Sequence, residues 1–299
     1  MPLIALSKII DNVIYVGGIN SLEEKICKDY KISFIGFKIN NNIFNLISNS
    51  YKIKLNNVKC ILSTGGFVSV PVLLYGIRKK IPIYLIEGNT EIGNTNKLFS
   101  VFSKKVFTAY KLDNKNQKYI VTGLPTLIEN DRFYKTEYDI LIIGGSLGSK
   151  PLCDLVYSLN NEYKIVLIAG KYYKDYMKIK NVDVVEYHKD LPSLMKKSRL
   201  IISRAGAMTT YEIFKINKPC IIIPSKTTKN NHQVSNAKYF EKANLCLYLE
   251  EDEAINLINN TVSKLLCSEA LVVNMKKKQY DLTKKDSVKL ILGEIDELN

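Results

Sequence analysis

Two segments in the second half of the chain place glycines and hydroxyl residues directly after an apolar run. The first is Gly-Gly-Ser-Leu-Gly at 144–148, and the second runs from Arg204 through Gly206 to Glu212. Glycine lets the backbone approach a ligand closely, and the free N–H groups at a helix start attract phosphate. Both segments therefore predict contacts with the phosphates of a nucleotide; a plain tight turn and an ordinary helix cap are the alternatives.

Neutral amide side chains follow in a third segment, 224–237, which begins at a proline and contains Gln233 and Asn236. Sugar hydroxyls need such oriented donors and acceptors. Glu212, at the end of the second segment, can in turn accept hydrogen bonds from ribose hydroxyls. These residue types together suit a ribose and a sugar, although the third segment could also be a simple helix cap.

Two more polar segments lie in the first half of the chain. They are Thr-Gly-Gly-Phe-Val-Ser-Val-Pro at 64–71 and Glu-Gly-Asn-Thr-Glu-Ile-Gly-Asn-Thr-Asn-Lys at 87–97. Each follows an apolar run. Because ligands of α/β proteins bind outside the carboxyl ends of parallel strands, we expect both segments on the rim of one crevice.

The elements that would position these segments are short apolar runs alternating with amphipathic stretches. Most runs are continuously apolar, which is typical of strands buried on both faces of a parallel sheet, and the stretches between them predict crossover helices. The predicted strands are residues 13–16, 33–37, 60–63, 83–86, 106–109, 119–122, 139–143, 164–169, 182–187, 200–203, 220–224 and 246–249. The pattern predicts the α/β class.

The length of 299 residues suits two domains. A polar segment between residues 125 and 137 separates two strand signals, and a new α/β unit opens after it. We therefore expect a first domain over 1–126, with 285–299 packing back on it, and a second over 135–284.

The formal net charge is +14, and most of the 43 basic residues are lysines. A basic surface favours acidic partners such as anionic lipid or phosphate substrates, whereas drift in overall composition explains the charge equally well. No nucleic-acid-binding signature is present, so no nucleic acid is expected as partner. The six cysteines form no Cys-x-x-Cys pair, and no apolar run approaches the roughly 20 residues of a membrane span. We expect a cytoplasmic protein without a metal.

The polar segments, in this order, resemble the MurG family of glycosyltransferases. In that family the first domain has Gly-Gly-Tyr-Val-Ser-x-Pro and Glu-x-Asn…Gly-x-x-Asn-Lys, and the second has Gly-Gly-Ser-x-Gly, Arg-x-Gly-Ala-x-Thr-x-x-Glu and His-Gln-x-x-Asn-Ala. This chain matches them at 65–71, 87–97, 144–148, 204–212 and 232–237. The resemblance extends over about residues 1–250, and the combination is far more specific than any one motif.

The resemblance implies two doubly wound Rossmann-like domains facing a cleft, the GT-B glycosyltransferase fold. It implies inverting transfer of N-acetylglucosamine from UDP-N-acetylglucosamine to the C4 hydroxyl of an undecaprenyl-pyrophosphoryl-N-acetylmuramyl-peptide. This step, from lipid I to lipid II, belongs to peptidoglycan synthesis and so to cell shape and cell division. No metal and no other cofactor is implied. The enzymes of the family are peripheral on the cytoplasmic face of the inner membrane.

Site residues follow from the same resemblance, position by position. Ser146 would meet the donor phosphates, Glu212 the ribose, Gln233 the N-acetylglucosamine hydroxyls, and the main chain at His188 the uracil. Asn89 would face the acceptor. The full set of donor-binding residues implied is Ser146, His188, Ala207, Met208, Thr209, Thr210, Tyr211, Glu212 and Gln233.

The chain also departs from the family. The family's first strand and Gly-rich loop, with the candidate catalytic base, would precede Pro2, so the first domain is expected to be truncated and no base can be named. Leu124 and Leu127 stand where the family has Asn and Arg, and Val70 replaces a glycine. A UDP-sugar hydrolase or epimerase of the same fold, and a non-catalytic remnant that binds the UDP-sugar, therefore remain as alternatives.

One stretch of the first domain suits contact with an anionic membrane. Its apolar residues are Leu98, Phe99, Val101, Phe102 and Phe107, and its basic border is Lys97, Lys104 and Lys105. This composition predicts a helix lying on the lipid surface. A helix that faces the core, with its lysines in solvent, is the alternative.

Overall fold

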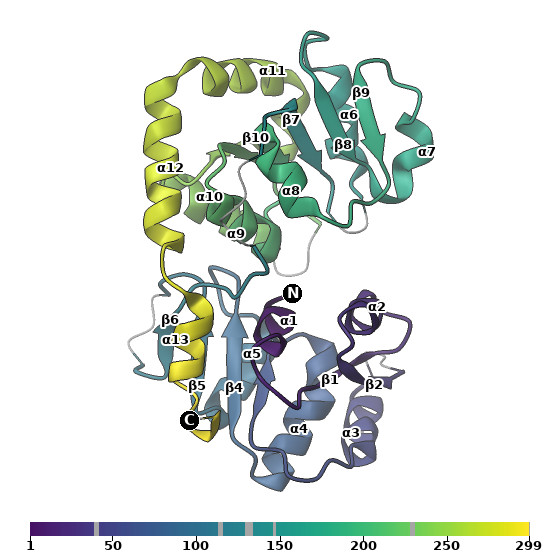
Figure 1. Cartoon of the computed structure of the whole chain (residues 1–299), viewed down its shortest axis with the longest axis vertical. Coiled ribbons are helices and arrows are strands. Elements are labelled where there is room, and N and C mark those ends of the chain that lie inside the picture. Colours follow the sequence, from purple (N-terminus) through teal and green to yellow (C-terminus); the bar gives the residue numbers. More distant parts are fainter. Residues whose placement is uncertain (39–41, 113–115, 129–133, 146–147, 228–230, 299) are drawn as a thin grey trace. The chain divides into compact units, whose positions relative to one another are not determined.

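The computed structural model describes residues 1–38, 42–112, 116–128, 134–145, 148–227 and 231–298, and the chain divides into two compact units (Figure 1). Unit 1 comprises Met1–Leu127 together with Lys285–Asn299, and unit 2 comprises Ile128–Lys284. Within the described residues, every helix is too short or too polar to span a bilayer.

Unit 2 is built on six parallel strands in the order β12-β11-β10-β7-β8-β9. The chain starts at the centre with β7, winds outward through β8 and β9, and then returns to β10 to wind the other way. This is a doubly wound sheet, whose winding reverses between β7 and β10. The strands are β7 (Tyr138–Ile143), β8 (Ile165–Ile168), β9 (Val182–Val185), β10 (Ser198–Ser203), β11 (Cys220–Ile222) and β12 (Leu247–Tyr248).

Helices connect these strands as the crossovers of a parallel sheet. They are α6 (Lys150–Asp154), α7 (Tyr173–Tyr176), α8 (Leu191–Lys196), α9 (Ala207–Ile216) and α10 (His232–Lys242), with short 3₁₀ turns η3 (Leu155–Tyr157) and η4 (Gly170–Tyr172). α11 (Glu251–Cys267) and α12 (Glu269–Thr283) follow the last strand. α12 packs against α9, and its Gln279 side chain donates from Nε2 to the carbonyls of Lys218 and Leu245. The last long helix of unit 2 is thereby tied to the segments that lead into β11 and β12.

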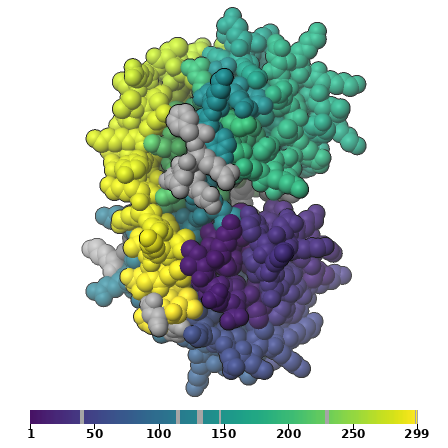
Figure 2. All heavy atoms as spheres, in the orientation of Figure 1, coloured from purple at the N-terminus to yellow at the C-terminus, as the bar shows by residue number. Residues whose placement is uncertain are grey.

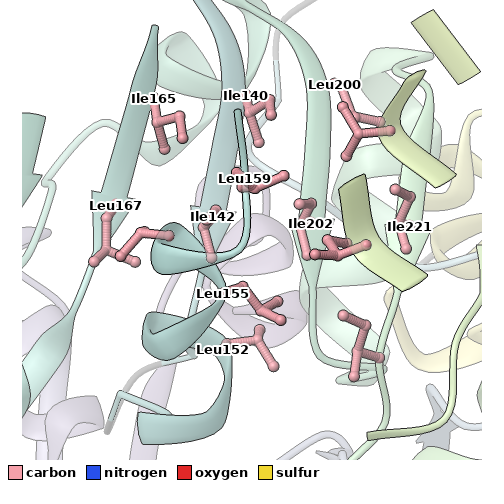
Figure 3. Close-up of a cluster of buried hydrophobic side chains, with 14 of the residues drawn as sticks. Ile140, Ile142, Leu152, Leu155, Leu159, Ile165, Leu167, Leu200, Ile202 and Ile221 are labelled. Atoms are coloured by element: carbon pink, nitrogen blue, oxygen red, sulfur yellow. The ribbon is translucent and has the colours of Figure 1, made fainter. Parts of the chain in front are cut away.

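The core of unit 2 explains why its strands are continuously apolar. In the centre of the sheet, Leu141 lies opposite Val166 of β8 and Ile201 of β10, and all three are buried. Alternate residues of β7, β8, β10 and β11 point to one side, where they meet leucines of α6, η3 and the turn after η3 (Figure 3). Helices cover the other face too, so neither face of these strands can be polar.

Unit 1 contains two parallel sheets in the described residues, β1-β2 and β3-β4-β5-β6. The strands are β1 (Ile14–Gly18), β2 (Ser33–Phe37), β3 (Ile61–Ser63), β4 (Ile83–Glu87), β5 (Lys105–Thr108) and β6 (Tyr119–Val121). The helices are α1 (Pro2–Ser7), α2 (Leu22–Asp29), α3 (Ile43–Lys52), α4 (Val70–Lys79), α5 (Asn94–Phe99) and α13 (Ser287–Gly293), with 3₁₀ turns η1 (Phe67–Ser69), η2 (Ser100–Phe102) and η6 (Asp296–Leu298).

The last residues of the chain belong to unit 1. Lys105 of β5 donates from Nζ to the Glu294 carbonyl at 2.8 Å and pairs with the Glu294 carboxylate at 2.9 Å. Ile291 and Ile295 are fully buried. The N-terminal segment, purple, and the C-terminal segment, yellow, are both visible on the face of unit 1 that Figure 2 shows.

The predicted α/β class is confirmed. Each of the twelve predicted strands is present, and its ends differ from the predicted ones by at most two residues. Buried parallel strands are easy to recognise because both of their faces need apolar residues, and their ends are harder to locate because the pattern fades where the chain reaches solvent.

Candidate functional site

A pocket of about 280 Å³ lies in unit 2 at the carboxyl ends of β7 and β10, where the winding of the sheet reverses. Loops diverge at such a point, which is where doubly wound folds bind ligands. The lining is polar and small, and it consists of Gly144, Gly145, Gly148, Ser203, Arg204, Gly206, Thr209 and Gln233.

The turn after β7 requires its glycines. Gly145 and Gly148 adopt positive φ values of 85° and 75°, which favour glycine. A Cβ on Gly148 would lie 2.3 Å from the Ala169 carbonyl oxygen, and one on Gly144 would lie 2.8 Å from the Ser149 nitrogen. The turn is therefore packed tightly against the end of β8. Ser146, the predicted phosphate ligand within this turn, lies outside the described residues.

α9 opens into the same pocket. Gly206 is its N-cap residue and supplies no side-chain cap, so the first N–H groups of α9 gain no partner from that side chain. A helix of ten residues begins here, and its dipole favours an anion at this end. The Thr210 hydroxyl donates to the Gly206 carbonyl at 2.8 Å, which fixes the first turn from within.

Arg204 forms the floor of the pocket and is almost completely buried. Its guanidinium donates from Nε and Nη2 to the Ser149 hydroxyl, at 3.1 and 2.6 Å, and from Nη1 to the Ile223 carbonyl at 3.1 Å. Nη2 also pairs with the Glu251 carboxylate. One side chain thus connects the starts of α6 and α11 with the ends of β10 and β11. The sequence motif contains this arginine, but the pattern predicts only the turn at Gly206 and the helix start, and no role for the arginine side chain.

α10 contributes two amide side chains to this region, of which Gln233 lines the pocket. Gln233 accepts a hydrogen bond at Oε1 from the Ser225 N–H at 2.9 Å, which leaves its Nε2 group to line the pocket. Asn236 is buried and donates from Nδ2 to the Ala205 carbonyl at 3.1 Å. Gln233 can therefore offer a donor to a sugar oxygen, whereas Asn236 holds the loop between β10 and α9.

Glu212 is buried on α9, with 9% of its surface exposed, and no other described side chain pairs with its carboxylate. Burial raises the pKa of this carboxyl from its usual 4.5 to about 7. A buried carboxylate without a partner is costly and is satisfied when hydroxyl donors approach it. Hydroxyl groups of a ligand would supply the hydrogen bonds that this carboxylate lacks.

The structure brings some of the predicted donor-binding residues together and separates others. Thr209 and Gln233 line the pocket with Gly206. Ala207 and Met208 are partly exposed in the first turn of α9, but Thr210 and Tyr211 are fully buried, so their side chains pack inside unit 2. The ligand contacts assigned to these residues stay predictions, and for Thr210 and Tyr211 they can involve only the backbone.

His188 lies beyond β9, two strands from β7 on the same edge of the sheet. Its Nδ1 atom is buried and has no hydrogen-bond partner among the described residues. Asn89, the predicted acceptor-side residue, is in unit 1 at the end of β4. Its backbone N–H and its Nδ2 group both donate to Glu87 Oε1 at 3.0 Å.

The predicted membrane stretch of unit 1 is only partly exposed. Phe99 of α5 and Phe107 of β5 are buried and belong to the interior, so their assignment to a lipid-facing surface is wrong. Leu98, Val101 and Phe102 do face solvent. Lys105 is held by Glu294, and Lys104 lies 3.9 Å from Asp296, so the basic border is partly neutralised.

Comparison with known proteins identifies the family. Residues 139–291 match the glycosyltransferase family 28 C-terminal domain. The chain belongs to this family. Two similar relatives are both named UDP-N-acetylglucosamine--N-acetylmuramyl-(pentapeptide) pyrophosphoryl-undecaprenol N-acetylglucosamine transferase. The one from Sulfurihydrogenibium sp. (strain YO3AOP1) is 30% identical over 92% of this chain and 84% of its own. The one from Clostridium botulinum (strain Loch Maree) is 30% identical over 96% and 92%.

Solved structures show the same fold as this family 28 chain. The Acinetobacter baumannii MurG structure has a TM-score of 0.79 and 22% identity, and the alignment covers 99% of this chain and 95% of that one. The calicheamicin glycosyltransferase CalG4 has a TM-score of 0.70 at 11% identity, over 99% and 93% of the two chains. These matches confirm the predicted GT-B class of fold.

The tight turn after β7 leads to a stability prediction. Gly148→Ala should lower the free energy of unfolding of unit 2 by about 1–3 kcal/mol, because the new methyl group meets the Ala169 carbonyl and the backbone is strained. Gly206→Ala is the matched control. It has a φ of −72° and nothing within 4 Å of a new Cβ, so only the N-cap preference for glycine is lost, and the change should stay below about 1 kcal/mol. Urea unfolding of the three proteins measures both; equal stabilities would contradict the packing described.

Proposed function

We propose that this family 28 protein transfers N-acetylglucosamine from UDP-N-acetylglucosamine to the C4 hydroxyl of an undecaprenyl-pyrophosphoryl-N-acetylmuramyl-peptide, with inversion. Unit 2 binds the donor, and unit 1 binds the acceptor. The observation that carries the proposal is the pocket at the switch point of unit 2, where a glycine turn and the uncapped start of α9 meet. The relatives named above carry this activity in their names.

The proposed donor pose uses the polarity of the pocket. The diphosphate lies against the Gly145 amide in the turn after β7 and against the amides of the first turn of α9, which stabilise the negative charge that grows on the leaving UDP. Glu212 accepts hydrogen bonds from the ribose hydroxyls. Gln233 donates from Nε2 to the sugar. The proton of the acceptor hydroxyl needs a general base, for which the chain offers no assigned residue.

Transfer tests the proposal directly. The purified chain should move radiolabelled N-acetylglucosamine from UDP to a muramyl-pyrophosphoryl lipid. Glu212→Gln should raise the KM for the donor about 10- to 100-fold, because a hydrogen bond to a charged group is worth about 1.5–3 kcal/mol. Release of free sugar without acceptor would instead identify a hydrolase. UDP binding with neither reaction would identify a non-catalytic remnant.

The raised pKa of Glu212 predicts how stability depends on pH. Its neutral form is favoured in the folded protein, so the folded state holds a proton that the unfolded state has lost between pH 4.5 and about 7. The stabilising contribution is complete below pH 4.5 and is lost as the pH rises through 7. Glu212→Gln should therefore match the wild type near pH 4.5 and exceed it in stability at pH 8, by at most about 3 kcal/mol. A difference independent of pH would contradict the burial described.

We further propose that unit 1 contacts the anionic cytoplasmic face of the cell membrane, and that α3 makes the main contact. α3 turns most of its apolar side chains outward, since Ile43, Phe44, Ile47 and Tyr51 are exposed, Phe44 to 77%. Leu46 is buried together with the polar Asn49 and Ser50.

Those inward polar groups are satisfied by the protein. Asn49 donates to the Lys38 carbonyl, and Arg78 of α4 donates to the Ser50 carbonyl at 2.9 Å and lies 4.0 Å from the Tyr51 ring. The outward apolar face is therefore fixed, and Lys38, Lys52 and Lys54 are exposed near it. An apolar helix face with lysines beside it suits an anionic lipid surface. The exposed remainder of the α5–η2 stretch, Leu98, Val101 and Phe102, adds a second, smaller apolar surface.

A liposome pelleting assay separates the two surfaces. Phe44→Ser with Ile47→Ser should reduce binding to vesicles that contain anionic lipid about tenfold, because two large apolar side chains leave the interface. Val101→Ser with Phe102→Ser should have a smaller effect. Vesicles of zwitterionic lipid are the control and should bind weakly in all cases. Undiminished pelleting of the α3 variant would rule out this contact.

A further inference from the structure

We infer that Glu87 is a positioning residue for the acceptor: its buried carboxylate holds Asn89 and the 88–93 loop at the carboxyl end of β4. The inference rests on the proposed function, in which this edge of unit 1 binds the acceptor, and it assigns the residue that shapes that edge. Glu87 is the last residue of β4 and is 3% exposed.

Both carboxylate oxygens of Glu87 are fully used. Oε1 accepts hydrogen bonds from the backbone N–H and the side-chain Nδ2 of Asn89, both at 3.0 Å. Oε2 accepts from the Gly93 N–H at 2.8 Å and from Asn96 Nδ2 at 2.9 Å. Four N–H groups therefore surround one buried carboxylate, and no lysine or arginine of the described chain forms an ion pair with it.

This arrangement makes the loop conformation depend on the charge. A buried carboxylate is tolerated only when donors satisfy it, and hydrogen bonds to a charged acceptor are about twice as strong as neutral ones. Two of the four donors, the Asn89 and Gly93 amides, belong to the loop backbone. If the loop left this conformation, the buried carboxylate would lose two of its four hydrogen-bond donors.

Asn96 extends the control of Glu87 to the neighbouring loop. Its Nδ2 group also donates to the Ile86 carbonyl at 3.2 Å, and its Oδ1 packs against the turn after β3. A Cβ on Gly65 would lie 2.7 Å from this oxygen, and Gly65 has a φ of 81°, so the turn fits the Asn96 amide only as glycine. The loops that follow β3 and β4 are therefore set by one connected group of side chains.

The same geometry excludes Glu87 as the general base. A base must reach the proton that it removes, but this carboxylate is buried and each of its oxygens already accepts two hydrogen bonds. What Glu87 presents to a ligand is the partly exposed amide residue Asn89. A neutral amide suits the hydroxyls of a sugar acceptor.

The test is Glu87→Gln, which keeps the size and removes the charge. Whichever way the new amide is oriented, its NH₂ group faces two N–H donors. Glu23→Gln is the matched control, since Glu23 is an exposed carboxylate in the first turn of α2 in the same unit. In Glu87→Gln the kcat/KM for the lipid-linked acceptor should fall about 100-fold, the size of effect that a small misplacement produces. The KM for UDP-N-acetylglucosamine should stay within about twofold.

Glu87→Asp separates positioning from loss of charge alone. The aspartate keeps the carboxylate but is one methylene shorter. If Glu87 positions the loop, Glu87→Asp should recover part of the acceptor kcat/KM that Glu87→Gln loses. If Glu87 instead acted on the substrate directly, the shorter side chain would not reach it and nothing would be recovered. Equal acceptor kinetics for Glu87→Gln and Glu23→Gln, with transfer intact in the wild type, would overturn the inference and leave the proposed function standing.

Hydrogen exchange tests the same claim without activity. The amides of Asn89 and Gly93 should exchange about tenfold faster or more in Glu87→Gln than in Glu23→Gln, while the amides of β4 before Glu87 keep their protection. Absent transfer by the wild type would refute the proposed function, and the exchange rates would still decide whether Glu87 holds the loop. Unchanged exchange at both amides would show that it does not.

Discussion

A single buried guanidinium holds together the loops that form the pocket of unit 2. Arg204 reaches the Ser149 hydroxyl, the Ile223 carbonyl and the Glu251 carboxylate, which belong to the segments that follow β7, β11 and β12. The planar fork of arginine can satisfy these acceptors together, whereas the point charge of lysine cannot. Because the donors are fixed before any ligand arrives, the glycine turn and the start of α9 are preorganised. Preorganised polar groups stabilise a developing charge without having to rearrange.

In unit 1 a buried side chain of the opposite charge holds the loops at the carboxyl ends of the strands. There the buried group is the Glu87 carboxylate, and N–H donors of the following loop surround it. In both units the charged side chain ends or directly follows a strand, and the protein itself satisfies it. Parallel sheets favour this design, because their carboxyl edges bring together loops that have no regular hydrogen bonds of their own.

The sequence predicted most of the fold but only part of the site. Buried strands such as 139–143 are recognisable because both faces must be apolar, and glycines after them indicate turns. The direction of a helix face is harder to predict. The apolar residues of α3 would normally be assigned to the core, but most of them are exposed, whereas Asn49 and Ser50 are buried and Arg78 donates to the Ser50 carbonyl. Conversely, Phe99 looked like a surface residue because lysines flank it, yet it is buried.

The role of Arg204 could not be predicted for a related reason. Its partners Ser149, Ile223 and Glu251 are 55, 19 and 47 residues away, and only the winding of the sheet brings them together. The glycines could be predicted because their constraint is local, a positive φ at one position. Hydrophobic periodicity reports burial and turn residues report backbone geometry, but neither one reports which charge will be neutralised by which distant group.

The resemblance places an asparagine and an arginine where this chain has Leu124 and Leu127, so one polar group and one cation expected for the proposed donor are replaced by leucines. Leu124 is 3% exposed and packs inside unit 1. The side chain at position 124 therefore packs in the core and makes no polar contact. Arg204 cannot replace the lost cation, because Glu251 already balances its charge. Attraction for a diphosphate then depends on the backbone amides at two turns, aided at longer range by the net charge of +14. Since long-range attraction is screened by salt and short amide contacts are not, donor association should be sensitive to ionic strength while donor geometry is not.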